Sequence, residues 1–315
     1  MIDAAAMDFY MVSDHNSGRD QEYTWWRIEK SEDMFHLPGS FVTLFGYERS
    51  VGYPNGHRNI IYSERGHRTL PIDPVEQAKE RDTGPLLYPH LRKNKGLAIS
   101  HTPHTYMGTD WRDNDPELEP VVEIFQGART SAEHDGAPLA PTKERTDLWA
   151  GSYRPLGFVW RAWEKGYKLG VVASSDHIST HTSYAMVLSE EFTRKGLMDA
   201  IRQRHTYGAT SNVILDFRLR DNGVDYIHGD MYSSDRVPLV VVKVIGTGKI
   251  KEIVVVRDNQ YVYRRPGSGM ESEFVFRETE LSPGEHYYYV RVEQEDQNVA
   301  WASPIWVTMR PGGQE

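Results

Sequence analysis

The sequence predicts an α/β domain followed by an all-β domain. The chain has 315 residues, which is enough for one large domain or two ordinary ones. In the first two thirds, short apolar runs alternate with helix-like segments, whereas beyond residue 211 strand-like runs follow one another with turn residues between them. We therefore expect one domain over residues 1–211 and a second over residues 212–315.

Five apolar runs of the first part suit parallel strands that are buried on both faces. They are DFYMV (8–12), FVTLFGY (41–47), GLAIS (96–100), VVEIF (121–125) and LGVVAS (169–174). Helix-like segments predict helices over 74–82, 155–166 and 194–204, and the last has Leu197, Ala200 and Ile201 at helical spacing. Strands that alternate with helices in this way are typical of an α/β architecture.

Seven strand-like runs of the second part are separated by turn residues such as DNG, GTG and SPGEH. They are VILDFRLR (213–220), PLVVVKVIG (238–246), KEIVVVRD (251–258), QYVYRR (260–265), EFVFRE (273–278), HYYYVRVEQ (286–294) and SPIWVTM (303–309). Short strands at this spacing predict a β-sandwich.

Composition excludes several classes of partner. Hydrophobic residues make up 39% and charged residues 26% of the chain, as in globular proteins. The net charge is −9 and there is no block of Lys or Arg, so we expect no nucleic-acid partner and no membrane partner. The chain has no cysteine, so a metal ion would need histidine and carboxylate ligands. Oligomeric state and compartment stay open.

Metal-ligand side chains follow the apolar runs of the first part. Asp14 and His15 follow the first run, Glu48 the second, His101 the third, and Asp176 with His177 the last. The carboxyl ends of parallel strands in a barrel meet on one face. A single histidine or acid is usually solvated or structural, but so many ionisable groups in one cleft would be costly to desolvate without a cation.

These residues predict a divalent metal site with His15, Glu48, His101, Asp176 and His177 as ligands. Adjacent residues of an extended segment point in opposite directions, so we expect Asp14 to hold a ligand in place rather than to bind the ion.

Three further residues are candidates for contact with a substrate. His104 is the candidate general acid or substrate-orienting group, and Arg58 could bind an anionic group. His57 precedes a strand-like run and could reach the same cleft.

The motifs SDH (13–15), GYE (46–48), SHTPH (100–104) and SSDH (174–177), in this order, resemble the polymerase-and-histidinol-phosphatase (PHP) superfamily. The segment RQRHTYGATS (202–211) and the end of the chain are similar to the branch that includes carbaryl hydrolase. The resemblance implies a distorted (β/α)7 barrel with divalent ions (Zn, Mn or Fe) at the strand ends. It implies that Glu48 bridges ions and that His15, His101 and Asp176 are ligands; His177 departs from the family's S-D-x-H spacing.

The family's first motif, an H-x-H after the first barrel strand, has no counterpart here. We therefore expect a barrel without its first strand, with one to three ions and with reduced metal occupancy or stability.

Together, the residues and the resemblance predict a metal-dependent hydrolase of a small-molecule ester: a phosphoester, or a carbamate or carboxylic ester. The alternative is a non-catalytic, degenerate PHP-like protein that binds a ligand such as carbohydrate through the β-sandwich, for example with Tyr287, Tyr288 and Tyr289.

Overall fold

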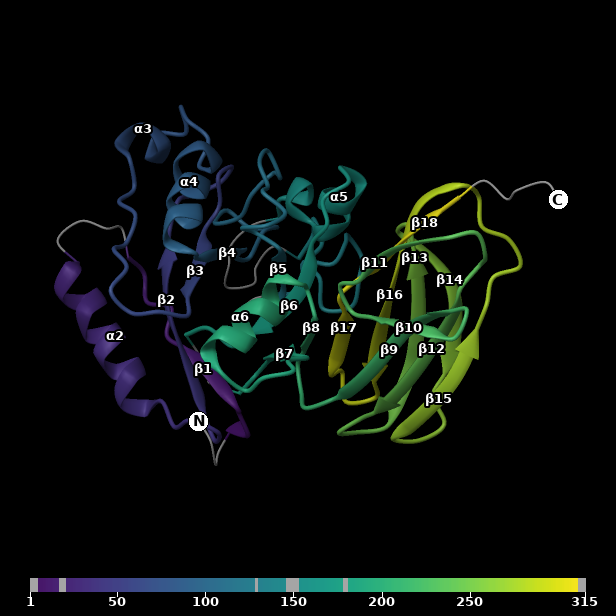
Figure 1. Ribbon diagram of the computed structural model, residues 1–315. Helices are drawn as coiled ribbons and strands as arrows, with labels where there is room; N and C mark the ends of the chain where they lie inside the picture. Colours follow the sequence, from purple (N-terminus) through teal and green to yellow (C-terminus); the bar gives the residue numbers. More distant parts are fainter. Residues whose placement is uncertain (1–4, 17–20, 128–129, 146–152, 178–180, 311–315) are drawn as a thin grey trace.

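The computed structural model describes the chain except for residues 1–4, 17–20, 128–129, 146–152, 178–180 and 311–315. The protein is mostly β, with 37% strand and 17% helix. Figure 1 shows the first part of the chain, with its helices, beside a second part made of strands. None of the helices in the described ranges is long and apolar enough to cross a bilayer.

A six-stranded sheet forms the centre of the first part. Its strands are, in spatial order, β1 (Phe9–Met11), β2 (Val42–Arg49), β3 (Arg58–Tyr62), β4 (Leu97–Ser100), β5 (Val121–Gln126) and β6 (Gly170–Ser174). The five apolar runs are thereby confirmed as strands. Strands β2, β4, β5 and β6 are almost wholly buried, which explains why their sequences are mainly apolar without alternation, and β3 is buried as well although it begins with Arg58 and Asn59.

Helices cover both faces of this sheet. The helices of the first part are α2 (Glu22–Phe35), α3 (Pro74–Gln77), α4 (Gly84–Asn94), η1 (Pro155–Gly157), α5 (Val159–Glu164) and α6 (Arg194–Arg202). Helices α2 and α4 pack on one face, against a set of buried residues that includes Tyr47 and Ile60. Helix α6 packs on the other face, where Met198 and Ile201 contact a set that includes Leu44.

The helix predictions were partly right. The helix over 194–204 is confirmed as α6, in which the Thr193 side chain accepts a hydrogen bond from the Gly196 amide. The segment 155–166 is divided into η1 and α5, and the segment 74–82 is helical only to Gln77. Helix α2 was missed because its buried face carries Glu29 and Glu32 as well as apolar residues, which conceals the helical period.

The predicted (β/α)7 barrel is wrong. Strands β2, β3 and β4 form an antiparallel meander, and among the described strands of this sheet only the pairs β1–β2, β4–β5 and β5–β6 are parallel. The sheet curves into a half-barrel, and the described residues do not close it. The expectation that a first barrel strand is missing assumed a (β/α)7 barrel, so it is wrong for the same reason.

The second part is a β-sandwich. One sheet has the order β10 (Val224–Ile227), β9 (Ile214–Asp221), β12 (Leu239–Ile245) and β15 (Glu271–Phe276). The second sheet contains β11 (Met231–Ser234), β18 (Ile305–Met309), β16 (Gly284–Gln294), β17 (Val299–Ala302), β8 (Thr206–Ala209) and β7 (Tyr184–Val187), with β13 (Ile250–Arg257) and β14 (Gln260–Pro266) branching from β16. The seven predicted strands are confirmed; β7, β10, β11 and β17 were not predicted.

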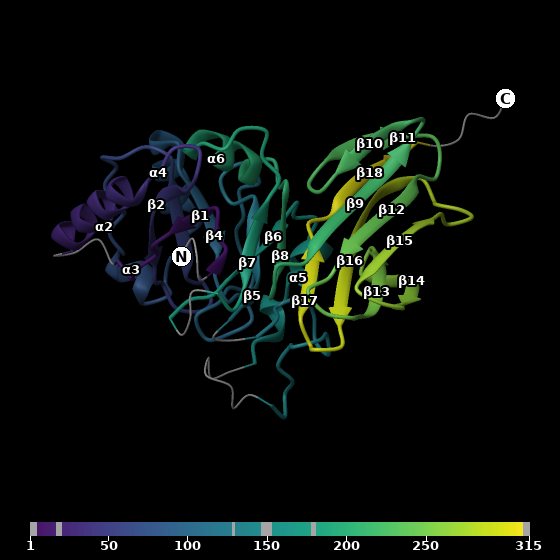
Figure 2. The same cartoon turned by 90° about the horizontal axis from the view of Figure 1, so that it is seen from below.

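The second sheet crosses the expected boundary at residue 211. Strand β8, which precedes the boundary, pairs with β17 near the end of the chain, and Figure 2 shows the two strands side by side. A buried acid in the first part, Glu133, accepts hydrogen bonds from Tyr289, Arg291 and Trp301 of the second. The division into domains stays a prediction, but one hydrophobic core extends across it.

Candidate metal centre

Strand pairing brings His15 and Glu48 together. Beyond the end of β1 the parallel pairing with β2 continues as a bridge between these two residues. The Glu48 amide donates to the Asp14 carbonyl at 3.0 Å, and the Asn16 amide donates to the Glu48 carbonyl at 2.8 Å. The backbone thus fixes the register in which the imidazole and the carboxylate meet.

Glu48 is the centre of the cluster. Its side chain is buried, and its Oε1 lies 3.3 Å from His15 Nδ1 and 2.5 Å from His57 Nδ1. The ligand atoms of His15, Glu48 and His57 all lie within 4.8 Å of one another, which is a spacing that suits one metal ion. His57, predicted only as a substrate-binding residue, therefore joins the candidate ligands.

His101 lies between three carboxylates. Its Nδ1 is 2.8 Å from Glu123 Oε2, although the approach lacks hydrogen-bond geometry and the contact is an ion pair. Its Nε2 lies 3.9 Å from Glu48 Oε2 and 3.6 Å from Asp176 Oδ2. The ring therefore presents one nitrogen to Glu123 and the other to the two predicted acidic ligands.

These contacts set the protonation of the cluster. Burial lowers the pKa of His101, but the negative charges of Glu123, Glu48 and Asp176 outweigh burial and raise it to about 9. Burial also opposes ionisation of Glu48, yet hydrogen bonds to His15 and His57 hold its pKa well below the usual range. In the absence of a cation, then, Glu48 is ionised and His101 carries the compensating proton.

The last predicted ligand, His177, and the predicted supporting residue Asp14 lie at the rim. The His177 side chain is exposed, and its ring stacks on that of His15 with 5.6 Å between centroids. Asp14 is exposed and lines a cavity beside the cluster, and its backbone carbonyl accepts the hydrogen bond from the Glu48 amide. The structure thus brings His15, Glu48, His101 and Asp176 together and leaves His177 and Asp14 beside them.

His104 and Arg58 do not line this cavity. His104 is buried against Phe158, with its Nε2 2.6 Å from Thr130 Oγ1, and burial lowers its pKa to about 3. Arg58 is buried in ion pairs with Glu119 at 3.0 Å and Asp113 at 2.7 Å. Both residues have partners within the protein that account for their placement.

Two residues of the cluster were not predicted as part of it. Glu123 is a fully buried acid in the apolar run of β5, and such an acid needs a charged or hydrogen-bonding partner, which was the available signal. Ser50 lies 2.6 Å from His15 Nδ1 and donates to Glu48 Oε1 at 3.2 Å. No sequence pattern identifies this serine, because its role depends on the β1–β2 register.

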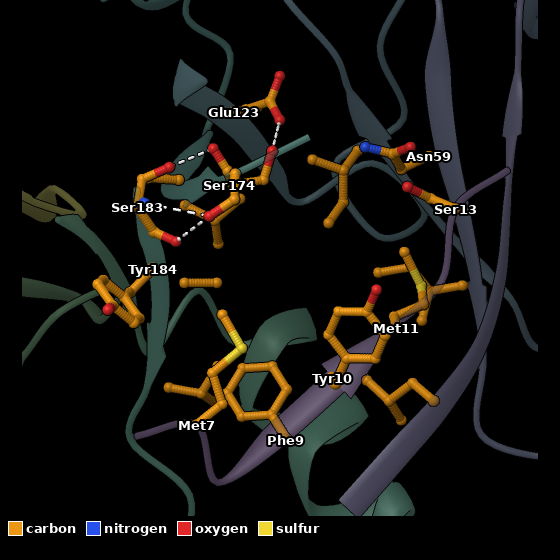
Figure 3. Close-up of a pocket in the computed structure, with 18 of the residues that line it drawn as sticks. Met7, Phe9, Tyr10, Met11, Ser13, Asn59, Glu123, Ser174, Ser183 and Tyr184 are labelled. Atoms are coloured by element: carbon orange, nitrogen blue, oxygen red, sulfur yellow. Dashed lines mark hydrogen bonds between the residues drawn. The ribbon is translucent and has the colours of Figure 1, made fainter. Parts of the chain in front are cut away.

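A cavity of about 880 Å³ opens beside the cluster. In Figure 3, Glu123, Ser174, Asn59 and Ser13 lie at one end of it, and Met7 and Phe9 lie toward the other. The carboxylate of Glu123 accepts a hydrogen bond from the Ser174 hydroxyl at this polar end. The cavity therefore joins a polar site to a mainly apolar chamber.

Comparison with known proteins identifies relatives without an assigned activity. Residues 3–135 match a family model described as "Protein of unknown function (DUF3604)". An uncharacterized protein of Chlamydia trachomatis is 27% identical over 346 aligned positions, and one of Chlamydia muridarum is 26% identical. Each alignment covers 98% of this chain and 53% of the relative, so the chain spans about half the length of the curated relatives it matches.

One solved structure is the CARDB domain of a Pyrococcus furiosus protein in complex with di-metal ions. It is 14% identical in sequence, and the superposition covers 31% of this chain and 92% of the CARDB chain. The TM-score is 0.21, which is too low to support an argument. The resemblance to the PHP superfamily is wrong: the matching family has no described function, and the structure lacks the barrel over the described residues. Family likeness thus gives no support for a hydrolase or phosphoesterase.

Proposed function

We propose that the cluster binds a divalent cation and that the protein hydrolyses a small-molecule ester with it. The observation that supports this most is the setting of His101, whose Nε2 faces Glu48 at 3.9 Å and Asp176 at 3.6 Å while Glu123 Oε2 lies 2.8 Å from Nδ1. A carboxylate on the far nitrogen of a ligating histidine is the usual arrangement in metal sites, because it fixes the ring and its tautomer.

The donor set fits such an ion. Imidazole nitrogens and carboxylate oxygens suit Zn²⁺ and similar cations. Donors that share one ion at ~2.1 Å lie roughly 3.0–3.4 Å apart in octahedral or tetrahedral geometry. The contacts of 3.3 Å between His15 and Glu48 and of 3.6 Å between His101 and Asp176 are close to that spacing, and the His101–Glu48 contact of 3.9 Å is longer.

The chain's own residues prepare the site. A bound divalent cation would supply a water of lowered pKa and would polarise the ester oxygen. Glu123 lies at the nitrogen of His101 that faces away from Glu48 and Asp176, and Ser50 donates to Glu48 Oε1. Glu48 stays ionised over the physiological range, so it is ready to bind a cation without losing a proton.

Hydrolysis of aryl esters tests the proposal. Protein stripped with a chelator and reloaded with Mn²⁺ or Zn²⁺ is assayed on 4-nitrophenyl phosphate and 4-nitrophenyl acetate. We expect turnover that requires the ion and that falls on the order of 100-fold or more in Glu48→Gln. The control Glu117→Gln removes an exposed carboxylate outside the cluster and is expected to leave turnover unchanged. No turnover of either ester with either ion would overturn the hydrolase proposal.

The alternative, a carbohydrate-binding sandwich, has no support in the structure. Tyr288 and Tyr289 are buried in the core, and Tyr287 packs against it with its hydroxyl bonded to Asn259. The three tyrosines therefore do not form an exposed aromatic platform.

A further inference from the structure

The apolar chamber lies on the same face of the sheet as the metal cluster. Side chains two residues apart in a strand point to the same face. On β2, Leu44 and Glu48 share a face, and both line the cavity; on β4 and the residue after it, Ile99 and His101 do the same. The chamber is therefore a continuation of the cluster's own face, and not a separate pocket.

Edge strands and a helix form the rest of the chamber wall. Strand β1 pairs only with β2, and strand β7 pairs only with β8, so each leaves one edge without a neighbour among the described strands. Their side chains are half-buried and include Phe9, Ala185 and Val187, and Leu197 of α6 adds to the lining. Figure 3 shows Phe9 and Met7 at the end of the cavity away from Glu123.

The shape of the cavity limits the ligand. Glu48 and Leu44 are four residues apart in one strand, which corresponds to roughly 13 Å from the cluster into the chamber. The side chains of Phe9, Leu44, Ile99 and Val187 offer no hydrogen bond. Hydroxyl groups such as those of Tyr10 and Tyr184 also line the cavity, but beside the four apolar side chains the polar groups of a sugar or nucleoside would find no partner, whereas an alkyl chain or aromatic ring would gain by leaving water.

We propose, on the basis of the hydrolase function proposed above, that the substrate is an ester with an apolar acyl, alkyl or aryl group. The ester bond lies at the cluster of Glu48, His101 and Asp176, and the apolar group extends into the chamber toward Phe9 and Leu197. Water attacks the carbonyl carbon or phosphorus, the ester C–O or P–O bond breaks, and the alcohol leaves with a proton from that water.

Chain length tests this inference. The metal-loaded protein is assayed on 4-nitrophenyl acetate, butyrate, hexanoate and octanoate. Each methylene that enters the chamber is expected to raise kcat/KM by about fourfold until the chamber is full. Binding is measured separately, from the thermal shift given by methylphosphonate and octylphosphonate, which cannot be hydrolysed. We expect octylphosphonate to stabilise the protein at lower concentration.

A variant with a smaller chamber provides a second test of the apolar-substrate inference. Ala185→Phe adds a ring to the wall at β7 and is expected to lower the octanoate-to-acetate ratio of kcat/KM at least tenfold. The matched control Val275→Phe adds a ring on β15, where Val275 is exposed, and is expected to keep the ratio of the parent protein.

The outcomes separate the two proposals. Turnover without dependence on chain length, or an Ala185→Phe ratio equal to that of Val275→Phe, would overturn the apolar-substrate inference and leave the hydrolase function standing. Absence of any turnover, with octylphosphonate still binding more tightly than methylphosphonate, would overturn the hydrolase function while supporting an apolar ligand for the chamber.

Discussion

Replacing Glu133 by alanine is expected to destabilise the protein by about 3–5 kcal/mol. The Glu133 carboxylate is fully buried and accepts hydrogen bonds from Tyr289 Oη at 2.6 Å, Arg291 Nη1 at 2.8 Å and Trp301 Nε1 at 2.9 Å. The substitution leaves these donors without their acceptor and removes a charge partner from the buried Arg291, which keeps only Glu293 at 3.1 Å.

Urea unfolding followed by tryptophan fluorescence and by circular dichroism measures the effect. The control Glu285→Ala breaks an ion pair with Lys168 that also joins the two parts, but Glu285 is half-exposed, so a loss of at most about 1 kcal/mol is expected. Because Glu133 connects the first part to β16 and β17, the loss should appear in a single transition seen by both probes. A loss no larger than that of the control would refute the assignment of a shared core.

Three other substitutions give separate tests. Burial raises the pKa of Glu32 from 4.5 to about 7, so its folded form binds a proton more tightly and stability falls as pH rises from about 4.5 to 7. Glu32→Gln should therefore raise the free energy of unfolding by up to about 3 kcal/mol at pH 8 and leave it unchanged at pH 4.5. Urea titrations at the two pH values measure this, and an equal effect at pH 8 and pH 4.5 would contradict it. Arg58→Met removes the charge partner of the buried Glu119 and should lower the free energy of unfolding by about 3–5 kcal/mol in the same assay, while KM for the ester is unchanged. A selective rise in KM would instead support the predicted role of Arg58 in substrate binding. Glu123→Gln should weaken metal binding 10–100-fold by loosening His101, as measured by calorimetry, and an unchanged affinity would count against that role.

Strands were predictable from the sequence, but their directions were not. The apolar runs of β2 and β4 are buried on both faces, and a buried strand has the same composition in a parallel or an antiparallel sheet. Strand β3 (Arg58–Tyr62) lies between them and reverses the direction twice. The sequence indicates a strand-like run after His57, but the five residues RNIIY do not show that this strand is antiparallel to both neighbours, so the alternation of strands and helices resembled a barrel.

The candidate site was partly predictable for a physical reason. His15, Glu48 and His101 each follow an apolar run, and the ends of these strands converge even though the sheet is not a barrel. Their partners could not be found in the same way. Glu123 lies inside a strand, and Ser50 contacts His15 only because β1 and β2 pair in one register.

Binding of a divalent cation is the central claim, and isothermal titration of the chelator-stripped protein with Mn²⁺ or Zn²⁺ at pH 7.5 tests it most directly. We expect saturable binding that releases a proton, because the pKa of His101 is about 9 and a bound cation requires the neutral ring. The released proton appears as a dependence of the heat on the ionisation enthalpy of the buffer. Glu48→Gln should lose this binding and Glu117→Gln should retain it; absence of saturable binding in the parent protein, or equal binding in Glu48→Gln, would contradict the account.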